Sequence, residues 1–214
     1  MINILINNIG YTCPTSWDDI TLAQAVRLES LSEQLSGAAK DALAEVYEPS
    51  AMRETADPGV QAELETFGEK IFGLLCGVTD QTVRATEPEH IRELVGRYLL
   101  RFAAGMIFEP DYVPRRITSF AWNGETLHLP RTDIDLAGMT MPMADASAAE
   151  LCGATDLYNA GRGAQAAMIV AMLCRPEGEP YDERRAKERA RTMTGLPMSI
   201  AMEVFFCLPQ RTIT

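Results

Sequence analysis

The chain has 214 residues, of which 47% are hydrophobic and 23% are charged, and its formal net charge is -11. This composition is typical of a folded globular protein and excludes the disordered and fibrous classes. The negative charge argues against nucleic acid as the main ligand, because proteins that bind nucleic acid neutralise its phosphates with clustered lysine and arginine.

The cysteines are odd in number, widely spaced and free of any C-x-x-C pair, and they are Cys13, Cys76, Cys152, Cys174 and Cys207. This pattern indicates neither a disulfide framework nor a zinc site, so we expect no intrachain disulfide. The N-terminus lacks the pattern of a signal peptide, and no apolar run approaches the roughly 18 residues of a membrane span. We therefore expect a protein of the reducing cytosol, neither exported nor inserted in a membrane.

The first predicted element is a β-hairpin. Residues 1–7 alternate partly and are rich in isoleucine, and turn residues separate them from residues 11–13. Pro14 ends the hairpin, because proline cannot donate a hydrogen bond to a strand ladder.

A helical cluster is predicted after this hairpin. Thr21–Gln24 fits a capping box, so a helix is expected to begin at Leu22 and to run to about Tyr47, with Gly37 as a weak point. The other elements expected in the first half are an exposed loop over 48–59, helices over 60–76, 79–83 and 88–102, and a glycine at 77 that ends the first of these helices.

The second half repeats this order. Residues 117–122 and 125–129 flank Asn123–Gly124, which fits a type I′ turn, so a second hairpin is predicted, and Pro130 ends it. Residues 147–150 fit a second capping box. The sequence of hairpin, proline, capping box and helices thus occurs twice, which favours an internal duplication.

A methionine-rich segment, residues 138–143, lies between this hairpin and the second capping box. Met139, Met141 and Met143 offer a soft apolar surface of the kind used by adaptable binding proteins, or else they belong to a strand or loop that packs on the core.

The C-terminal third predicts three helices. Residues 166–174 are apolar without a break, so this helix must be covered on all sides. Proline and glycine in residues 175–180 predict a turn. Residues 182–193 carry a thin apolar stripe and many charges, so their basic side chains are interpreted as a solvated face rather than an anion site; these are Arg184, Arg185, Lys187, Arg189 and Arg191.

The last helix is expected to begin at Pro197 and to have two apolar faces. One face carries Met198, Met202, Phe205 and Phe206, and the other carries Ile200, Val204 and Cys207. Either the second face closes the core against residues 71–76, or it is covered by another chain. In that case Phe205 or Phe206 will be substantially exposed.

No catalytic, metal-binding or cofactor-binding motif is recognisable. His90 and His128 are far from any serine, cysteine or carboxylate pattern of a known hydrolase, and no phosphate-binding loop is present. Gly161-Arg162-Gly163 does not follow a strand, so it does not indicate a dinucleotide site. We therefore expect a protein that is not an enzyme and that carries no cofactor.

Three passages resemble proteins encoded among the tail and morphogenesis genes of bacteriophages, especially those of the Bacteroides group. They are residues 14–22 (PTSWDDITL), residues 72–80 (FGLLCGVTD) and residues 171–182 (AMLCRPEGEPYD). The resemblance implies a small, mainly helical accessory protein such as a tail assembly chaperone. It implies no active-site residues.

Three classes of function therefore remain. The first is an assembly chaperone of the host cytoplasm, which binds a phage structural protein through apolar helix surface that includes the seven candidate partner-binding side chains, Met139, Met141, Met143, Met198, Met202, Phe205 and Phe206. The second is a structural component of the virion, and the third is an enzyme of unrecognised type. Homo-oligomerisation is also possible for such surfaces, whereas nucleic acid and membranes are not expected partners.

The expected architecture is α+β and predominantly helical, with two small hairpins that are each followed by a helical cluster. The two parts are residues 1–115 and 116–214. We expect them to form one compact unit, because hairpins of this size are marginally stable without helices to cover them.

Overall fold

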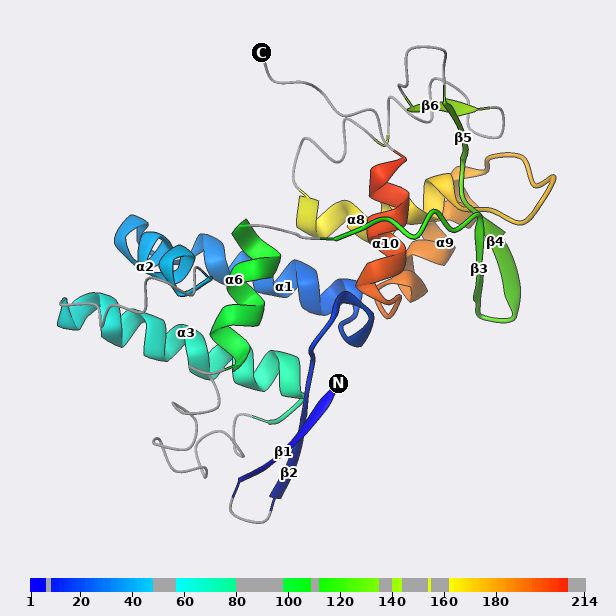
Figure 1. The fold of residues 1–214 in the computed structure, drawn as a ribbon. Helices are drawn as coiled ribbons and strands as arrows, with labels where there is room; N and C mark the ends of the chain where they lie inside the picture. Colours follow the sequence, from blue (N-terminus) through cyan, green and yellow to red (C-terminus); the bar gives the residue numbers. More distant parts are fainter. Residues whose placement is uncertain are drawn as a thin grey trace. The chain divides into compact units, whose positions relative to one another are not determined.

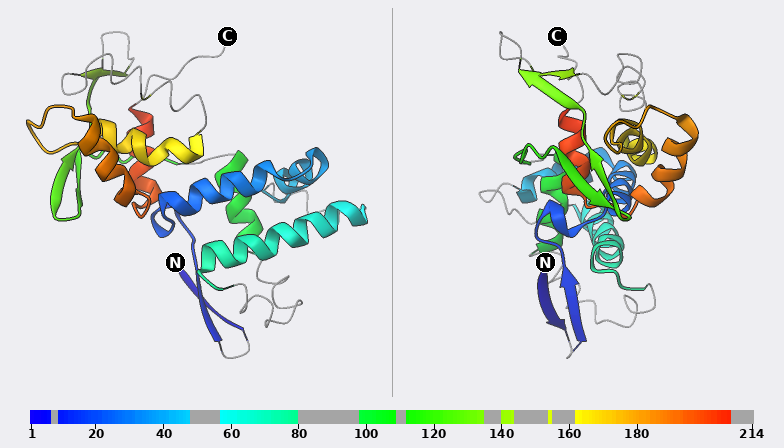
Figure 2. Two further views of the ribbon diagram at one scale, coloured as in Figure 1. Left: turned by 180° about the vertical axis from the view of Figure 1, so that it is seen from behind. Right: turned by 90° about the vertical axis from the view of Figure 1, so that its right-hand side faces the viewer.

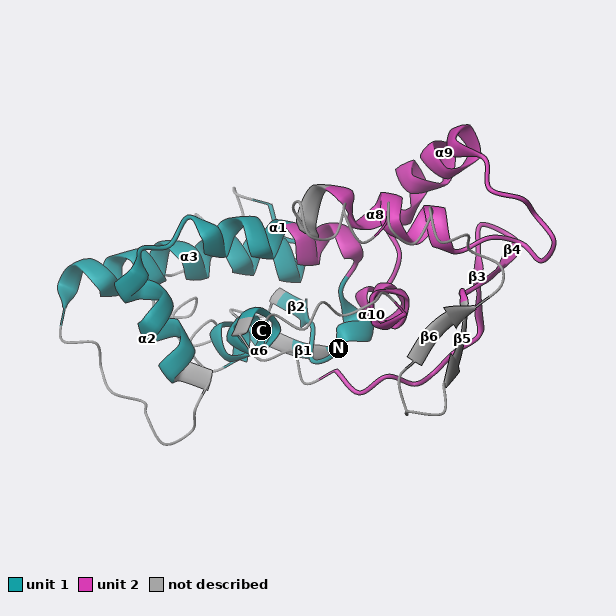
Figure 3. Ribbon diagram, turned by 90° about the horizontal axis from the view of Figure 1, so that it is seen from above, with its two compact units in different colours: residues 1–20, 27–111 teal, residues 21–26, 112–214 magenta. Residues whose placement is uncertain are grey.

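A computed structural model describes residues 1–6, 9–47, 57–79, 98–108, 112–134, 140–143, 154 and 162–207. The protein is α+β with helices predominating (Figure 1). The described strands form three separate two-stranded antiparallel sheets. By its internal contacts the chain divides into unit 1, residues 1–20 with 27–111, and unit 2, residues 21–26 with 112–214 (Figure 3). The expected domain boundary after residue 115 stays a prediction.

Unit 1 combines a hairpin with helices. Its described elements are β1 (Ile2–Ile6), β2 (Ile9–Cys13), η1 (Trp17–Asp19), α1 (Leu22–Glu33) from Arg27 onward, α2 (Gly37–Tyr47), α3 (Pro58–Cys76) and α6 (Leu100–Phe108). The first predicted hairpin is confirmed, since Ile2 pairs with Cys13 and Ile6 pairs with Ile9. Helix α2 packs against α3 and α6, and α3 contacts β2. The core includes Leu28, Leu43, Ile71, Phe72 and Leu99.

Helix α1 begins where the sequence predicts. The backbone N–H of Gln24 donates to Oγ1 of Thr21 at 3.2 Å, and the N–H of Thr21 donates to Oε1 of Gln24 at 2.8 Å. These two bonds complete the capping box, because each satisfies a donor that the first turn of a helix leaves free.

The single helix expected over residues 22–47 is wrong, because α1 ends at Glu33 and α2 begins at Gly37. Ser36 supplies the new start: the backbone N–H of Ala39 donates to its Oγ at 3.2 Å. The carboxylate of Glu63 in α3 accepts from both the N–H and the hydroxyl of Ser36, each at 2.6 Å. A local cap and a contact from a distant helix therefore stabilise the break.

Helix α3 begins two residues earlier than predicted and ends as predicted. Asp57 caps it, accepting from the N–H of Gly59 at 2.7 Å, and Pro58 occupies its first turn. Gly77 ends it with φ +64°, a left-handed conformation that glycine adopts without strain. The other elements predicted in this half lie wholly or partly outside the described residues. These parts are residues 48–56 of the loop, the helix over 79–83 beyond Thr79, and residues 88–97 of the last helix.

The described part of unit 2 contains two hairpins and three helices. Its described elements are β3 (Ser119–Trp122), β4 (Glu125–His128), β5 (Arg131–Ile134), β6 (Thr140–Met143), α8 (Arg162–Leu173), α9 (Glu183–Met193) and α10 (Met198–Phe206), together with the first residues of α1. The hairpin β3–β4 confirms the prediction, with φ +49° at Asn123 and +80° at Gly124. The sequence does not predict the pairing of β5 with β6, since residues 138–143 read only as a strand or loop.

Helix α8 is the centre of unit 2, as its apolar sequence predicts. It packs against α9 and α10 (Figure 2), and Ile169, Val170 and Cys174 are fully buried. The turn predicted after it is confirmed, with Gly178 at φ +75°. Two main-chain hydrogen bonds between His128 and Arg175 join the end of β4 to the segment that follows α8.

Residues 21–26 complete this core although they lie about ninety residues upstream. The N–H of Leu22 donates to the carbonyl of Leu196 at 2.7 Å, and the N–H of Ala23 donates to the carbonyl of Thr194 at 2.9 Å. The Leu22 side chain is buried among the apolar residues of unit 2. The N-terminal turn of α1 is thus a structural part of unit 2.

Helix α9 lies at the surface of unit 2 along most of its length. Ala186 and Met193 are its buried residues. Four of its five basic side chains are exposed, namely Arg184, Arg185, Lys187 and Arg191. Arg189 differs from them, because it is largely buried and its guanidinium lies 2.7 Å and 2.8 Å from the two carboxylate oxygens of Glu179. No helix in the described ranges is both long enough and apolar enough to cross a membrane.

Candidate partner-binding site

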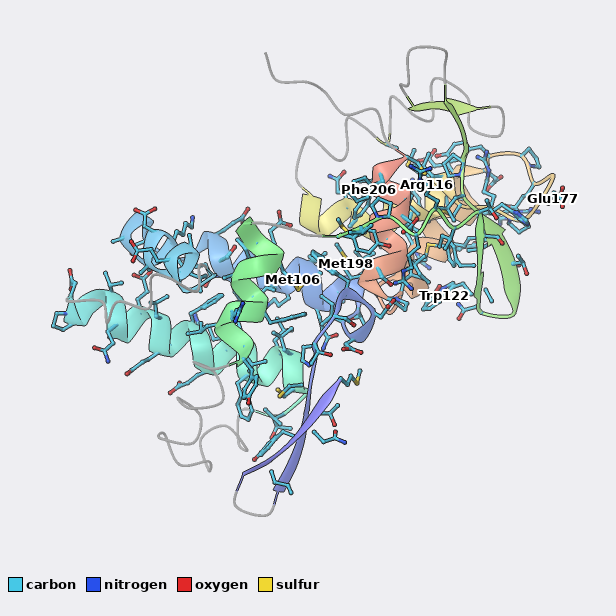
Figure 4. All side chains as sticks on the ribbon, in the orientation of Figure 1. Met106, Arg116, Trp122, Glu177, Met198 and Phe206 are labelled. Atoms are coloured by element: carbon cyan, nitrogen blue, oxygen red, sulfur yellow. The ribbon has the colours of Figure 1, made fainter. Side chains whose placement is uncertain are left out.

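Helix α10 has one buried side and one partly open side. Ala201, Val204 and Phe205 face the core of unit 2. Met198, Met202 and Phe206 follow one another at four-residue spacing, so they lie along one line of the helix, which we call the α10 stripe. The two methionines are half-buried, and Phe206 is 44% exposed. Met198 and Phe206 lie toward opposite ends of α10 (Figure 4).

Tyr112 extends the α10 stripe beyond the helix. Its ring stacks on that of Phe206, with centroids 5.9 Å apart and planes inclined by 27°. Val113, the next residue in the chain, is 80% exposed. An aromatic pair and an exposed aliphatic side chain therefore share this part of the surface, a combination that is characteristic of interfaces.

A buried carboxylate, Glu203, holds Tyr112 against α10. The Tyr112 hydroxyl is hydrogen-bonded to Oε1 of Glu203 and also lies 3.0 Å from the carbonyl of Ser199. Glu203 further accepts from the backbone N–H of Arg115 at 2.6 Å and from that of Ile117 at 3.3 Å. Only 4% of Glu203 is exposed, and these donors offset the cost of removing a carboxylate from water.

The chain bends at Arg116 to make this contact possible. Arg116 has φ +56°, a left-handed conformation that costs about 1 kcal/mol or more in a residue other than glycine. Because of this bend, the N–H groups of Arg115 and Ile117 point at the same carboxylate, as in the backbone nests that bind anions. These hydrogen bonds hold the 112–117 segment against α10.

The same contact changes the acidity of Tyr112. Burial, followed by the hydrogen bond to Glu203 and its negative charge, raises the pKa of Tyr112 to about 12. The phenol thus remains a neutral hydrogen-bond donor at every physiological pH.

The described residues offer no metal centre. They contain no group of three or more histidine, cysteine, aspartate or glutamate side chains that could hold a metal ion. His128 lies on β4, where its main chain bonds to Arg175, and His90 lies outside the described residues.

The seven predicted partner-binding residues do not form one surface in the described part of the structure. Met198, Met202 and Phe206 form the α10 stripe, whereas Phe205 is buried in the core of unit 2. Met141 and Met143 lie on β6 opposite Asp133 and Arg131, and their side chains are not among the described ones. Met139 lies outside the described residues.

Sequence reasoning missed Tyr112, Arg116 and Glu203. A weak signal existed, because Ser199 and Glu203 are the two polar residues in an otherwise apolar helix and stand four residues apart. A lone carboxylate in such a helix indicates a specific buried partner. The segment that partners Glu203 lies 86 to 91 residues upstream, so it could not be predicted from local pattern.

No family model, curated protein or solved structure matches the chain.

Proposed function

We propose that the chain is a non-enzymatic accessory of bacteriophage tail assembly, a chaperone that binds an apolar segment of a tail protein through the α10 stripe and Tyr112. The observation that carries the proposal is the 44% exposure of Phe206 on a helix whose opposite side is buried. The sequence resemblance to phage tail and morphogenesis proteins supplies the class of partner.

The energetics of this surface favour a chaperone over a permanent virion component. Covering the open part of one aromatic ring contributes about 1–2 kcal/mol, because apolar burial yields about 25 cal/mol per Å². Two half-buried methionines add less, and their flexible thioethers adapt to different apolar sequences. A contact to which the exposed side chains contribute so little is suited to release, as a chaperone requires when it gives up its client, and less to permanent incorporation.

The test uses Phe206→Asp, with Leu5→Asp as the matched control. Leu5 is 77% exposed on β1, so the control introduces the same charge at an exposed apolar position of unit 1. Each variant is expressed together with candidate phage tail proteins, and the soluble, co-purifying fraction of each tail protein is measured. We expect Phe206→Asp to lose the client and Leu5→Asp to retain it, with unchanged circular dichroism for both.

Two results would contradict the proposal. A Phe206→Asp variant that unfolds would place the side chain in a core, consistent with the cost of burying an unpaired charge. Recovery of the protein in stoichiometric amounts from purified phage particles would favour the structural component instead. Sedimentation of the isolated protein tests the further alternative that a second copy covers the α10 stripe.

We also propose that the two halves descend from a duplication. Support comes from the order of elements, since β1–β2 is followed by α1–α3, and β3–β4 is followed, after β5–β6, by α8–α10. A superposition of the two halves with matching connectivity is the expected result, and unrelated paths of the chain would reject the duplication.

A further inference from the structure

Strand β2 and helix α3 meet in unit 1 through two matched pairs of side chains. Tyr11 and Cys13 are two residues apart on the strand and therefore point to the same face, where both are buried. Phe72 and Cys76 are four residues apart on the helix and share one side of it. The rings of Tyr11 and Phe72 lie 5.2 Å apart, and Cys13 lies against Cys76 at the last turn of α3.

The two sulfur atoms are unusually close for free thiols. Their separation is 2.7 Å, well inside the roughly 3.5–4.0 Å of ordinary non-bonded contact between heavy atoms, and longer than a covalent bridge of about 2.05 Å. Both cysteines are free thiols in the structure. The packing of Tyr11 on Phe72, two residues before Cys13 and four before Cys76, fixes the register that brings the two thiols together.

We propose that Cys13 and Cys76 are a redox-sensitive pair that forms a reversible disulfide and fastens the β1–β2 hairpin to the end of α3. The oxidant is a low-molecular-weight disulfide such as oxidised glutathione. The Cys76 thiolate attacks one sulfur of the oxidant, which forms a mixed disulfide and releases one small thiolate. The Cys13 thiolate then attacks the Cys76 sulfur and releases the second.

The balance of this exchange is complete. The two protein thiols together lose two protons and two electrons, and the small disulfide accepts them and leaves as two thiols. An excess of a reducing thiol drives the same steps backwards and restores Cys13 and Cys76.

Burial decides the order of the two steps. Cys13 is fully buried, so a dissolved disulfide cannot reach it, whereas Cys76 is half-buried at the end of its helix. The hydrogen bond between the thiols raises the pKa of Cys76 and lowers that of Cys13, so access to the dissolved disulfide, and not acidity, makes Cys76 the first to react. The first attack therefore accelerates as pH rises, and the second follows quickly because Cys13 is already in contact with its target.

Two cysteines of unit 2 provide an internal contrast. Cys174 is fully buried like Cys13, and Cys207 lies at the end of α10 as Cys76 lies at the end of α3. Cys207 is half-buried like Cys76, but its Sγ lies 3.3 Å from the carbonyl of Glu203, to which it donates. Cys207 is thus a matched control for Cys76.

The test treats the full chain with oxidised glutathione across pH 7 to 9 and analyses non-reduced peptides by mass spectrometry. We expect one linked peptide pair containing Cys13 and Cys76, lighter by two hydrogen atoms than the reduced peptides. Because the bridge closes a loop of about sixty residues, the Tm reported by Trp17 should rise by more than about 5 °C and fall again on addition of dithiothreitol.

Three variants distinguish the pair from general thiol oxidation. Cys76→Ser should abolish both the linked peptide and the shift in Tm, and Cys207→Ser should retain both. Cys13→Ala should leave Cys76 as a stable mixed disulfide with glutathione, because the second thiol is gone. Alanine is chosen at position 13 because a polar serine in this buried position could prevent folding.

The proposal is overturned if glutathione accumulates on Cys76 in the unmodified chain without a linked peptide, or if both thiols stay reduced throughout. A linked peptide that disappears in Cys207→Ser but survives in Cys76→Ser would also overturn it, since the reactive cysteine would then lie in unit 2.

Discussion

At the scale of the residue, Glu203 is a carboxylate buried in an apolar helix and satisfied by partners on one short segment. Removing a charge from water costs several kcal/mol unless hydrogen bonds replace the lost solvent. Tyr112, Arg115 and Ile117 provide those bonds. The same contacts present Tyr112 beside Phe206, so the group that anchors the segment also shapes the surface proposed to bind a partner.

The first prediction concerns the titration of Tyr112. Its pKa of about 12 lies above the value of 10.0 for the free side chain. The unfolded chain therefore releases this proton first as pH rises. The stabilisation is complete below about pH 10 and is lost as pH rises to about 12. We expect the free energy of unfolding, measured by urea denaturation, to fall across this window by up to about 2 kcal/mol.

Two variants assign this effect to Tyr112. In Tyr112→Phe the highest step of the tyrosinate absorbance titration should disappear. In Glu203→Gln that step should move toward lower pH, because the negative charge that disfavours the phenolate is gone. An unchanged titration curve in both variants would show that Tyr112 does not carry the raised pKa.

At the scale of the element, the correct predictions rest on turns and helix caps that are defined by residues close together in the chain. Asn123–Gly124 predicts its turn because the two residues themselves favour positive φ. Gly77 predicts the end of α3, and Thr21 with Gln24 predicts the start of α1, for similar reasons. Each signal is complete within four residues of chain.

The missed features depend on residues that are far apart in the chain. The break between α1 and α2 is stabilised by Glu63, twenty-seven residues after Ser36, and Ser36 alone resembles an ordinary exposed helix residue. The pairing of β5 with β6 is likewise set by tertiary structure: the methionines of residues 138–143 alternate as in a strand, but the glycine and proline of the same segment argue against one. Helix and strand propensities are too weak to predict such choices.

The second prediction concerns the β3–β4 turn. Gly124 has φ +80°, and a Cβ added there would meet nothing within 4 Å, so the cost of Gly124→Ala is purely one of backbone conformation. We expect a loss of about 1 kcal/mol in the free energy of unfolding, measured by urea denaturation with Trp122 fluorescence.

Gly10→Ala is the matched control for this substitution. Gly10 lies in β2, and a Cβ added there would likewise meet open space, but its φ is not positive. The alanine variant should be as stable as the parent or slightly more so. Equal losses at both glycines would mean that the turn conformation is not the source of the cost.

At the scale of the whole molecule, neither unit is one continuous stretch of the chain. Residues 21–26 belong with residues 112–214, because Leu22 and Ala23 bond to Leu196 and Thr194 and the Leu22 side chain enters the unit 2 core. From Arg27 onward the same helix belongs to unit 1. No local pattern in the sequence predicts a change of unit within one helix.

The third prediction tests this assignment with two leucines of α1. Leu22 and Leu28 are each 1% exposed, yet the first belongs to unit 2 and the second to unit 1. The chain has two tryptophans, Trp17 in unit 1 and Trp122 in unit 2, so single-tryptophan variants report on each unit separately. Leu22→Ala should cost about 2–5 kcal/mol, the usual range for truncating a buried leucine, and should lower the Trp122 transition in urea more than the Trp17 transition.

Leu28→Ala should do the reverse, since it opens a comparable cavity in the other core. The pair of substitutions changes the same side chain in the same helix, so differences in helix propensity or residue volume cannot produce opposite effects on the two tryptophans. Equal shifts of both transitions by both variants would mean that the chain unfolds as one cooperative core, and that the first turn of α1 stabilises the two units alike.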